Sequence, residues 1–346
     1  TSRGLGDVYK RQQINRHTII FARNKPLIYN WKGILTRFIF TIQDISGVRL
    51  NRRIPKMVIT TKEKNDMETV KLNNGVEMPI LGYGVYQVTP EECERCVSDA
   101  IGVGYRLIDT AQAYFNEGNV GNAIRKCGVP RNELFITTKI WVSNAGEKKA
   151  AASIDESLRK LQTEYIDLLL IHQPFGDYYG TYRAMETAYK AGKVRAIGVS
   201  NFYPDRFIDL AEHVEVKPAI NQVETHVFNQ QVEAQKIMKQ YGTQIMSWGP
   251  FAEGRNDLFR NEVLTAIGAK YGKSSAQTAL RFLVQRGVIA IPKSTHIERM
   301  QQNLDIFDFR LSDEDMAAIT ALDQAESLFF SHYDPETVKF ILSLKI

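Results

Sequence analysis

The sequence predicts the α/β class, as a (β/α)₈ TIM barrel with an N-terminal β-hairpin and a C-terminal extra helix. Eight short apolar runs alternate with amphipathic segments of about helix length, a pattern typical of a parallel sheet covered by helices. An open dinucleotide-binding sheet would carry G-x-G-x-x-G after its first strand. The segment Gly82–Gln87 lacks that glycine spacing, and eight strands without it favour the closed barrel.

Turn and capping residues place the individual elements. Asn74-Gly75 lies between alternating residues and predicts the hairpin. Thr89 and Pro90 predict the start of the first helix, and Ser312, followed by three acids, predicts the start of the last. The predicted strands are Ile80–Gly84, Leu107–Asp109, Phe135–Thr138, Leu168–His172, Val194–Val199, Ala219–Val223, Gln244–Ser247 and Val288–Ile291. The predicted helices include Glu91–Val103, Gly118–Cys127, Glu147–Leu161, Thr181–Ala191, Pro204–His213, Gln231–Tyr241 and Ser275–Arg286.

Residues 1–66 differ from the rest of the chain. They hold 14 Lys or Arg and 4 Asp or Glu and show neither helical nor strand periodicity. Ser2–Gln12 reads SRGLGDVYKRQ and resembles the translation of an adapter used in sequencing libraries. Our hypothesis is that residues 1–66 are a non-native extension of adapter-derived and read-through sequence, that Met67 is the native start, and that 67–346 form the barrel. A real, basic and disordered extension is the alternative.

Composition excludes several classes of protein. The chain carries a net charge of +5, but residues 67–346 alone carry −5, so the basic balance that would suggest nucleic-acid binding belongs to the extension. No apolar run reaches the roughly 20 residues of a membrane span. Three cysteines are too few for a disulfide framework and favour a reducing, cytoplasmic compartment. Cys93 and Cys96 have no second pair at metal-ligand spacing, so we read them as structural and predict no metal site.

Titratable side chains terminate three of the predicted strands. Asp109 ends the second, Lys139 the third and His172 the fourth, and Tyr114 follows Asp109 by five positions. A closed barrel brings the carboxyl ends of its strands to one rim, where barrel enzymes have their active sites. Each residue alone would be an ordinary loop or core residue. Together they predict a catalytic group.

These four residue types suit the reduction of a carbonyl group. The reaction needs a hydride donor and a proton for the developing alkoxide. A tyrosine phenol is a weak acid near neutrality, but a nearby ammonium such as that of Lys139 stabilises the phenolate. Asp109 can hold Lys139 ionised and oriented. His172 can donate a hydrogen bond to the carbonyl oxygen.

The core closely resembles the aldo-keto reductases, from the Asn74-Gly75 hairpin to Asp334-Pro335. The strings that carry the resemblance are GYRLIDTA at 104–111, YFNE at 114–117 and IPKS at 291–294. The resemblance implies a catalytic tetrad of Asp109, Tyr114, Lys139 and His172, with Tyr114 as the proton donor. It also implies NADPH as the cofactor and a small-molecule carbonyl compound as the substrate.

The resemblance assigns further residues to the cofactor. Ser200, Asn201 and Gln222 should hold the nicotinamide carboxamide, and Trp248, followed by Gly249 and Pro250, should stack on the ring. A tryptophan here resembles the microbial diketogluconate-reductase-like branch. Lys293, Ser294 and Arg299 should bind the 2′-phosphate, since two cations and a hydroxyl near a helix start suit a phosphate, and Asn303 should meet the adenine.

The resemblance places the substrate pocket at Tyr86, Trp141, Gln173 and Phe251. Because the segments around these residues and the 24-residue tail after Leu322 are short, we expect a shallow pocket and a reductase of broad specificity that accepts small aldehydes, α-dicarbonyls and keto sugars. We expect it to act as a monomer. A non-catalytic, NADPH-binding family member with a redox-sensing or regulatory role is the alternative, and an unrelated barrel enzyme is a third hypothesis.

Overall fold

Eight parallel strands form one continuous sheet in the computed structural model, which describes residues 68–346. The extension predicted at residues 1–66 lies outside the described residues. The strands pair in the order β10-β9-β8-β7-β6-β5-β4-β3, each parallel to its neighbours. They are β3 (Tyr83–Gly84), β4 (Leu107–Asp109), β5 (Phe135–Ile140), β6 (Leu168–Ile171), β7 (Ile197–Ser200), β8 (Ile220–Glu224), β9 (Gln244–Trp248) and β10 (Ile289–Ala290).

Hydrogen bonds between the first and last strands close the sheet into the predicted barrel. Leu81 and Ala290 form a parallel bridge. The Gly82 N–H donates to the Ala290 carbonyl at 2.8 Å, and the Ala290 N–H donates to the Ile80 carbonyl at 2.9 Å. Closure removes both sheet edges and brings all eight carboxyl ends to one rim.

The predicted hairpin covers the opposite end of the barrel. It consists of β1 (Thr69–Lys71) and β2 (Glu77–Pro79), which are antiparallel. Gly75 lies at φ +86° in the turn, a conformation that glycine adopts without strain. The Asn74 side chain donates to the Arg195 carbonyl just before β7, and that of Asn73 donates to the Pro218 carbonyl just before β8. The site must therefore lie at the other rim.

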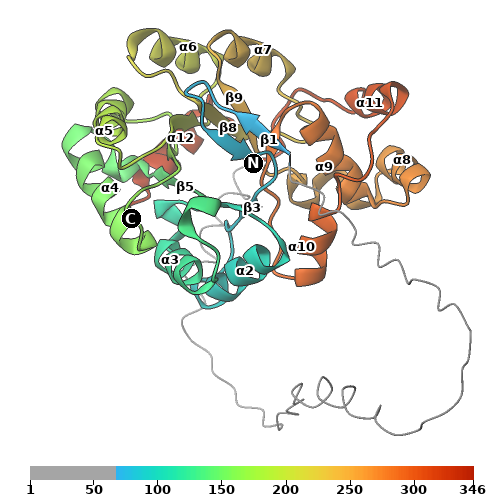
Figure 1. The fold of residues 1–346 in the computed structure, drawn as a ribbon. Coiled ribbons are helices and arrows are strands. Elements are labelled where there is room, and N and C mark those ends of the chain that lie inside the picture. The colour runs from blue at the N-terminus through green and yellow to red at the C-terminus, as the bar shows by residue number, and fades with distance from the viewer. Residues whose placement is uncertain (1–67) are drawn as a thin grey trace, which may run out of the picture. The chain divides into compact units, whose positions relative to one another are not determined.

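Helices surround the strands (Figure 1). Those predicted at Glu147–Leu161 and Pro204–His213 have the predicted bounds, and the others differ by a few residues at most. The helices are α2 (Pro90–Val103), α3 (Glu117–Lys126), α4 (Glu147–Leu161), α5 (Tyr178–Lys190), α6 (Pro204–His213), α7 (Val232–Gln240), α8 (Glu262–Tyr271), α9 (Ser275–Gln285), α10 (Ile297–Leu304), α11 (Asp313–Thr320) and α12 (Pro335–Ser343). Within residues 68–346, four 3₁₀ segments lie in the connections between strands and helices: η2 (Gln112–Tyr114), η3 (Arg131–Glu133), η4 (Val142–Asn144) and η5 (Ala252–Arg260).

The predicted helix starts are found, with one correction. Pro90 is the first residue of α2, although Thr89 makes no side-chain cap. The Ser312 hydroxyl accepts from the Asp315 N–H and caps α11. However, α11 is not the last helix as predicted. Helix α12 follows, with the Asp334 carboxylate accepting from the Thr337 N–H.

The buried apolar side chains of residues 68–346 form two separate clusters. The larger fills the barrel and the layer between strands and helices. The smaller contains Ala113, Trp141, Phe175 and Ile341, and the partly buried Phe330 and Leu344 pack against it. This second cluster contains residues from the rim at the carboxyl ends of the strands and from the C-terminal tail. The site at this rim is therefore bounded by the barrel on one side and by the tail on the other.

Candidate active site

The barrel brings together the four residues predicted for catalysis. Asp109 is the last residue of β4, Lys139 lies in β5, His172 directly follows β6, and Tyr114 ends η2. These strands are hydrogen-bonded neighbours. The four side chains therefore converge at the rim, as the strand pattern predicted.

A buried ion pair forms the base of the site. The Lys139 Nζ lies 2.5 Å from the Asp109 Oδ1, and both side chains are at most 3% exposed. Nζ also donates to the Thr110 carbonyl at 3.0 Å and to the Tyr114 hydroxyl at 3.4 Å. Burial lowers the pKa of Lys139 and raises that of Asp109, and each group opposes the shift of the other. The ammonium thus lies beside the phenol whose anion it would stabilise.

His172 is a neutral imidazole at the same rim. Burial first, then the charge of Lys139 and the neighbouring His332, holds its pKa well below the ordinary value. Its ring meets those of Tyr114 and Trp141 edge-on, with centroids 5.6 and 5.1 Å apart. Nδ1 is buried with no hydrogen-bond partner within residues 68–346. A neutral ring can donate a hydrogen bond to a bound oxygen but is a poor general acid.

The residues predicted for the nicotinamide carboxamide lie at the end of β7, directly after it, and in β8. The Asn201 side chain, on a residue at φ +64°, donates to the His172 carbonyl at 3.0 Å. The Ser200 hydroxyl donates to the Gln222 carbonyl at 2.8 Å. The Gln222 side chain donates to the Asp109 Oδ2 at 2.9 Å, so this polar group is contiguous with the tetrad.

The end of β9 continues this arrangement. The Trp248 indole N–H donates to the Asn201 Oδ1 at 2.8 Å, which fixes the ring beside the amide group. Gly249 follows at φ +62°, and Pro250 precedes the loop that contains η5. An aromatic face next to amide and hydroxyl groups has the chemistry that a nicotinamide requires.

A second group of predicted residues surrounds the start of α10. Lys293 and Arg299 are exposed, and neither forms an ion pair with another residue of the described chain. The buried Ser294 hydroxyl accepts from the His296 N–H at 3.1 Å, just before the helix. Asn303, one turn beyond Arg299, is buried. Unpaired cations at a helix N-terminus suit a phosphate.

The comparisons with known proteins agree with this geometry. The model of the aldo/keto reductase family matches residues 80–324. The chain belongs to this family. The prediction of an oxidoreductase acting on carbonyl or alcohol groups is thereby confirmed, and the hypothesis of an unrelated barrel enzyme is wrong.

Three similar proteins illustrate the relationship. The glyoxal reductase of Bacillus subtilis is 48% identical over 261 residues, which cover 75% of this chain and 94% of that protein. A protein assigned as a 2,5-diketo-D-gluconic acid reductase B is 38% identical with a TM-score of 0.74, over 77% of this chain and 95% of its own. The Bombyx mori aldo-keto reductase, solved with NADP, is 34% identical with a TM-score of 0.73, over 79% and 97%. The family uses NADP(H), as predicted.

Three of the four residues predicted for the substrate pocket adjoin the tetrad. The Tyr86 ring lies 5.1 Å from that of Tyr114, and Trp141 adjoins His172. Gln173 is buried next to His172, and its Oε1 lies 2.8 Å from the His332 Nε2. Phe251 instead packs on Phe259 in η5.

The C-terminal tail packs against residues at this rim, a contact that the sequence pattern did not predict. The Trp141 indole N–H donates to the Leu344 carbonyl at 2.9 Å, and Ile341 is buried in the cluster around Trp141. The short tail therefore packs against Trp141, one of the residues predicted for the substrate pocket, and the shallow pocket stays a prediction. Asp334-Pro335-Glu336, an N-cap, proline and acid in order, was the signal for α12.

The C-x-x-C motif of the sequence lies in α2. Cys93 and Cys96 are buried there as free thiols. Residues 68–346 contain no cluster of three or more potential metal ligands. None of their helices is long and apolar enough to span a membrane.

Proposed function

We propose that this protein is an NADPH-dependent reductase of aldehydes and ketones. The observation that supports this best is the contact between the Tyr114 hydroxyl and the Lys139 Nζ. The Asp109 carboxylate pairs with the same ammonium, and His172 lies beside the phenol ring. A proton donor, a group that stabilises its anion and a neutral hydrogen-bond donor stand at one rim.

The residues around the site fit NADPH. Asn201, Ser200 and Gln222 would hold the carboxamide, and the Trp248 face would support the ring. Lys293, Ser294 and Arg299 would bind the 2′-phosphate, with Asn303 near the adenine. When bound, NADPH supplies the hydride.

The chain's own residues handle the oxygen and its proton. His172 donates a hydrogen bond to the carbonyl oxygen and orients it toward Tyr114. As negative charge develops on this oxygen, the Tyr114 hydroxyl delivers its proton, and the Lys139 ammonium stabilises the phenolate that remains. Asp109 keeps the ammonium in place. The tail covers Trp141 and restricts access of water to the rim.

The substrates we propose are small aldehydes and α-dicarbonyls such as methylglyoxal, with keto sugars as a further class. Aromatic walls supply apolar contact that discriminates weakly, by about 1–3 kcal/mol per methylene. The glyoxal reductase relative supports the same class. We further propose a monomer that acts in the cytoplasm.

The decisive experiment is NADPH oxidation by wild type and Tyr114→Phe with a panel of these carbonyl compounds. We expect Tyr114→Phe to bind NADPH normally and to lose about 10²-fold or more in kcat, the contribution of a positioned general acid. Tyr241→Phe, whose hydroxyl bonds to Glu212 on the outer surface, is the matched control. Tight NADPH binding by wild type without turnover of any compound would favour the non-catalytic alternative.

A further inference from the structure

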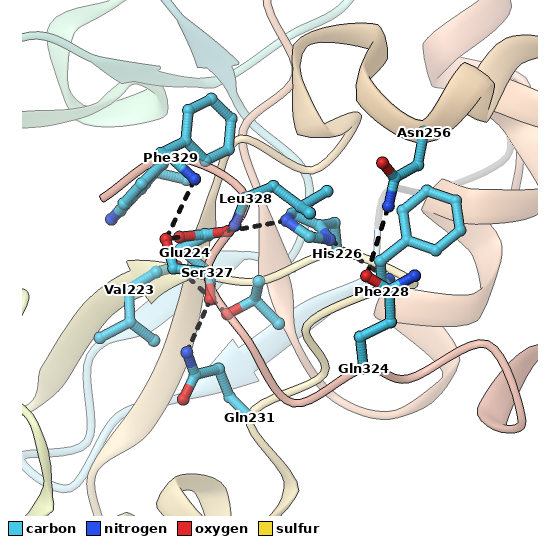
Figure 2. Close-up of polar contacts among 12 residues, drawn as sticks. Val223, Glu224, His226, Phe228, Gln231, Asn256, Gln324, Ser327, Leu328 and Phe329 are labelled. Carbon is cyan, nitrogen blue, oxygen red and sulfur yellow. Dashed lines mark hydrogen bonds and ion pairs between the residues drawn. The ribbon is translucent and has the colours of Figure 1, made fainter. Parts of the chain in front are cut away.

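A buried carboxylate outside the tetrad holds the C-terminal tail. Glu224 is the last residue of β8 and is 5% exposed. Its Oε1 accepts from the Leu328 N–H at 2.9 Å and its Oε2 from the Ser327 hydroxyl at 2.5 Å (Figure 2). The sequence separation of 103 residues makes this a connection between the barrel and a distant segment.

His226 completes the contacts of this carboxylate. Its Nδ1 accepts from the Phe228 N–H at 3.2 Å. The proton of the neutral ring therefore lies on Nε2, which donates to the Glu224 Oε1 at 2.9 Å. Glu224 thus accepts three hydrogen bonds, one from the barrel side and two from the tail.

Ser327 extends the contact to the following residues. Its hydroxyl oxygen accepts from the N–H groups of both Phe329 and Phe330, at 3.1 Å each. Three consecutive backbone N–H groups, those of residues 328–330, are therefore satisfied by Glu224 directly or through Ser327. This matters because Asp323–Asp334 contains neither helix nor strand, and the segment has no ladder of its own.

The two phenylalanines so fixed pack on Trp248. The Phe329 ring meets Trp248 at 5.2 Å and 64°, and the Phe330 ring is stacked on it at 6.2 Å and 18°. Phe330 also packs against the cluster that contains Trp141. It therefore lies between the aromatic group proposed for the cofactor ring and the one beside His172.

We propose that Glu224 is a positioning residue, which holds Ser327–Phe330 through the Ser327 hydroxyl and the Leu328 N–H and so makes Phe330 a wall of the substrate pocket. The inference rests on the proposed function, because the wall matters only if a carbonyl compound binds beside His172. A purely structural contact would affect folding and all substrates alike. A positioning contact affects the affinity for substrates large enough to reach the wall.

Ser327→Ala removes the hydroxyl and leaves the buried carboxylate in place. We expect the amides of residues 328–330 to exchange hydrogen at least about tenfold faster, since two of them lose their acceptor. We expect KM for 4-nitrobenzaldehyde to rise about tenfold, with kcat, the NADPH affinity and KM for methylglyoxal nearly unchanged. Ser327→Thr keeps a hydroxyl and should restore both exchange and KM.

Phe330→Ala and Glu224→Gln extend the test from the wall to the anchor. Both should raise KM for 4-nitrobenzaldehyde. The double variant Ser327→Ala/Phe330→Ala should have a KM little higher than that of Phe330→Ala, because both changes remove the same wall. Glu326→Gln, an exposed carboxylate of the same tail, is the matched control and should behave as wild type. If Glu224→Gln fails to fold, the variants of Ser327 and Phe330 still test the proposal.

Unchanged exchange in Ser327→Ala, or faster exchange with unchanged KM, would overturn the proposal. So would an equal loss of kcat for both aldehydes. A wild-type protein that turns over neither aldehyde contradicts the proposed function instead, and the exchange measurement then decides separately whether Glu224 fixes the tail.

Discussion

The two sides of the site are built in different ways. The tetrad side comes from neighbouring barrel strands, and its base is an ion pair between residues that are both almost fully buried. The tail side comes from a segment joined to the barrel by contacts across 103, 159 and 203 residues, made by Ser327, His332 and Leu344. It packs on its own small apolar cluster. If the proposed function is right, we expect the chemistry to depend on the barrel side and the fit of the substrate to depend on the tail side.

The largest effect should come from breaking the ion pair on the tetrad side. Lys139→Met leaves the Asp109 carboxylate buried without its cation, which should lower the free energy of unfolding by about 3–5 kcal/mol and abolish measurable turnover. Chemical denaturation and NADPH oxidation measure the two effects. Lys148→Met, on the exposed surface of α4, should change neither. A Lys139→Met variant as stable as wild type would show that the pair contributes little to the barrel.

A second prediction concerns the cofactor side of the barrel rim. Replacing both Lys293 and Arg299 by Ala should raise the Kd for NADPH by about 100-fold, because two charge-assisted contacts to the 2′-phosphate are lost. NADH lacks this phosphate and should bind almost as before. Fluorescence titration of the variant with NADPH and with NADH measures the two Kd values. Equal losses for the two would remove these residues from the phosphate site.

A third, smaller effect should come from the tail. Ile341→Ala opens a cavity in the cluster around Trp141, where Ile341 is 1% exposed. Such truncations cost about 2–5 kcal/mol locally, and because the cluster is separate from the barrel core, we expect KM for aromatic aldehydes to rise while the main unfolding transition hardly moves. The adjacent Leu342→Ala, at an exposed position, is the control. A large fall in Tm would mean that tail and barrel unfold as one unit.

The same difference explains what the sequence could predict. Asp109, Lys139 and His172 each stand at or near the end of an apolar run, and barrel closure brings such ends together whatever the intervening helices are. The roles of Phe330, His332 and Leu344 depend on where an irregular segment returns to the barrel, and no periodicity encodes that path. The loop after β9 is irregular in the same way, because it turns through several residues at positive φ, and the place of Phe251 in the substrate pocket stays a prediction.

The last prediction concerns the pH dependence of stability that His332, on the tail side, should cause. Burial first, then the charge of Arg206, lowers the pKa of His332 to about 3, against 6.5 for an exposed histidine. Near neutrality both the folded and unfolded states hold this ring neutral, so it has no pH-dependent effect. Below about pH 6.5 the unfolded chain binds a proton that the folded protein does not, and stability falls by up to about 1.4 kcal/mol per pH unit until the folded group itself titrates.

His332→Gln removes this contribution, so its stability should fall less steeply than that of wild type between pH 6.5 and pH 4.5, as measured by urea unfolding at each pH. His172 has a lowered pKa as well, but burial and the charge of Lys139, its two larger causes, are the same in both proteins, so the difference belongs mainly to His332. His213→Gln, at an exposed position on α6, is the matched control. Parallel curves for wild type and His332→Gln would mean that the tail opens and hydrates His332 before the barrel unfolds, and would make the tail side even more independent of the tetrad side than the contacts indicate.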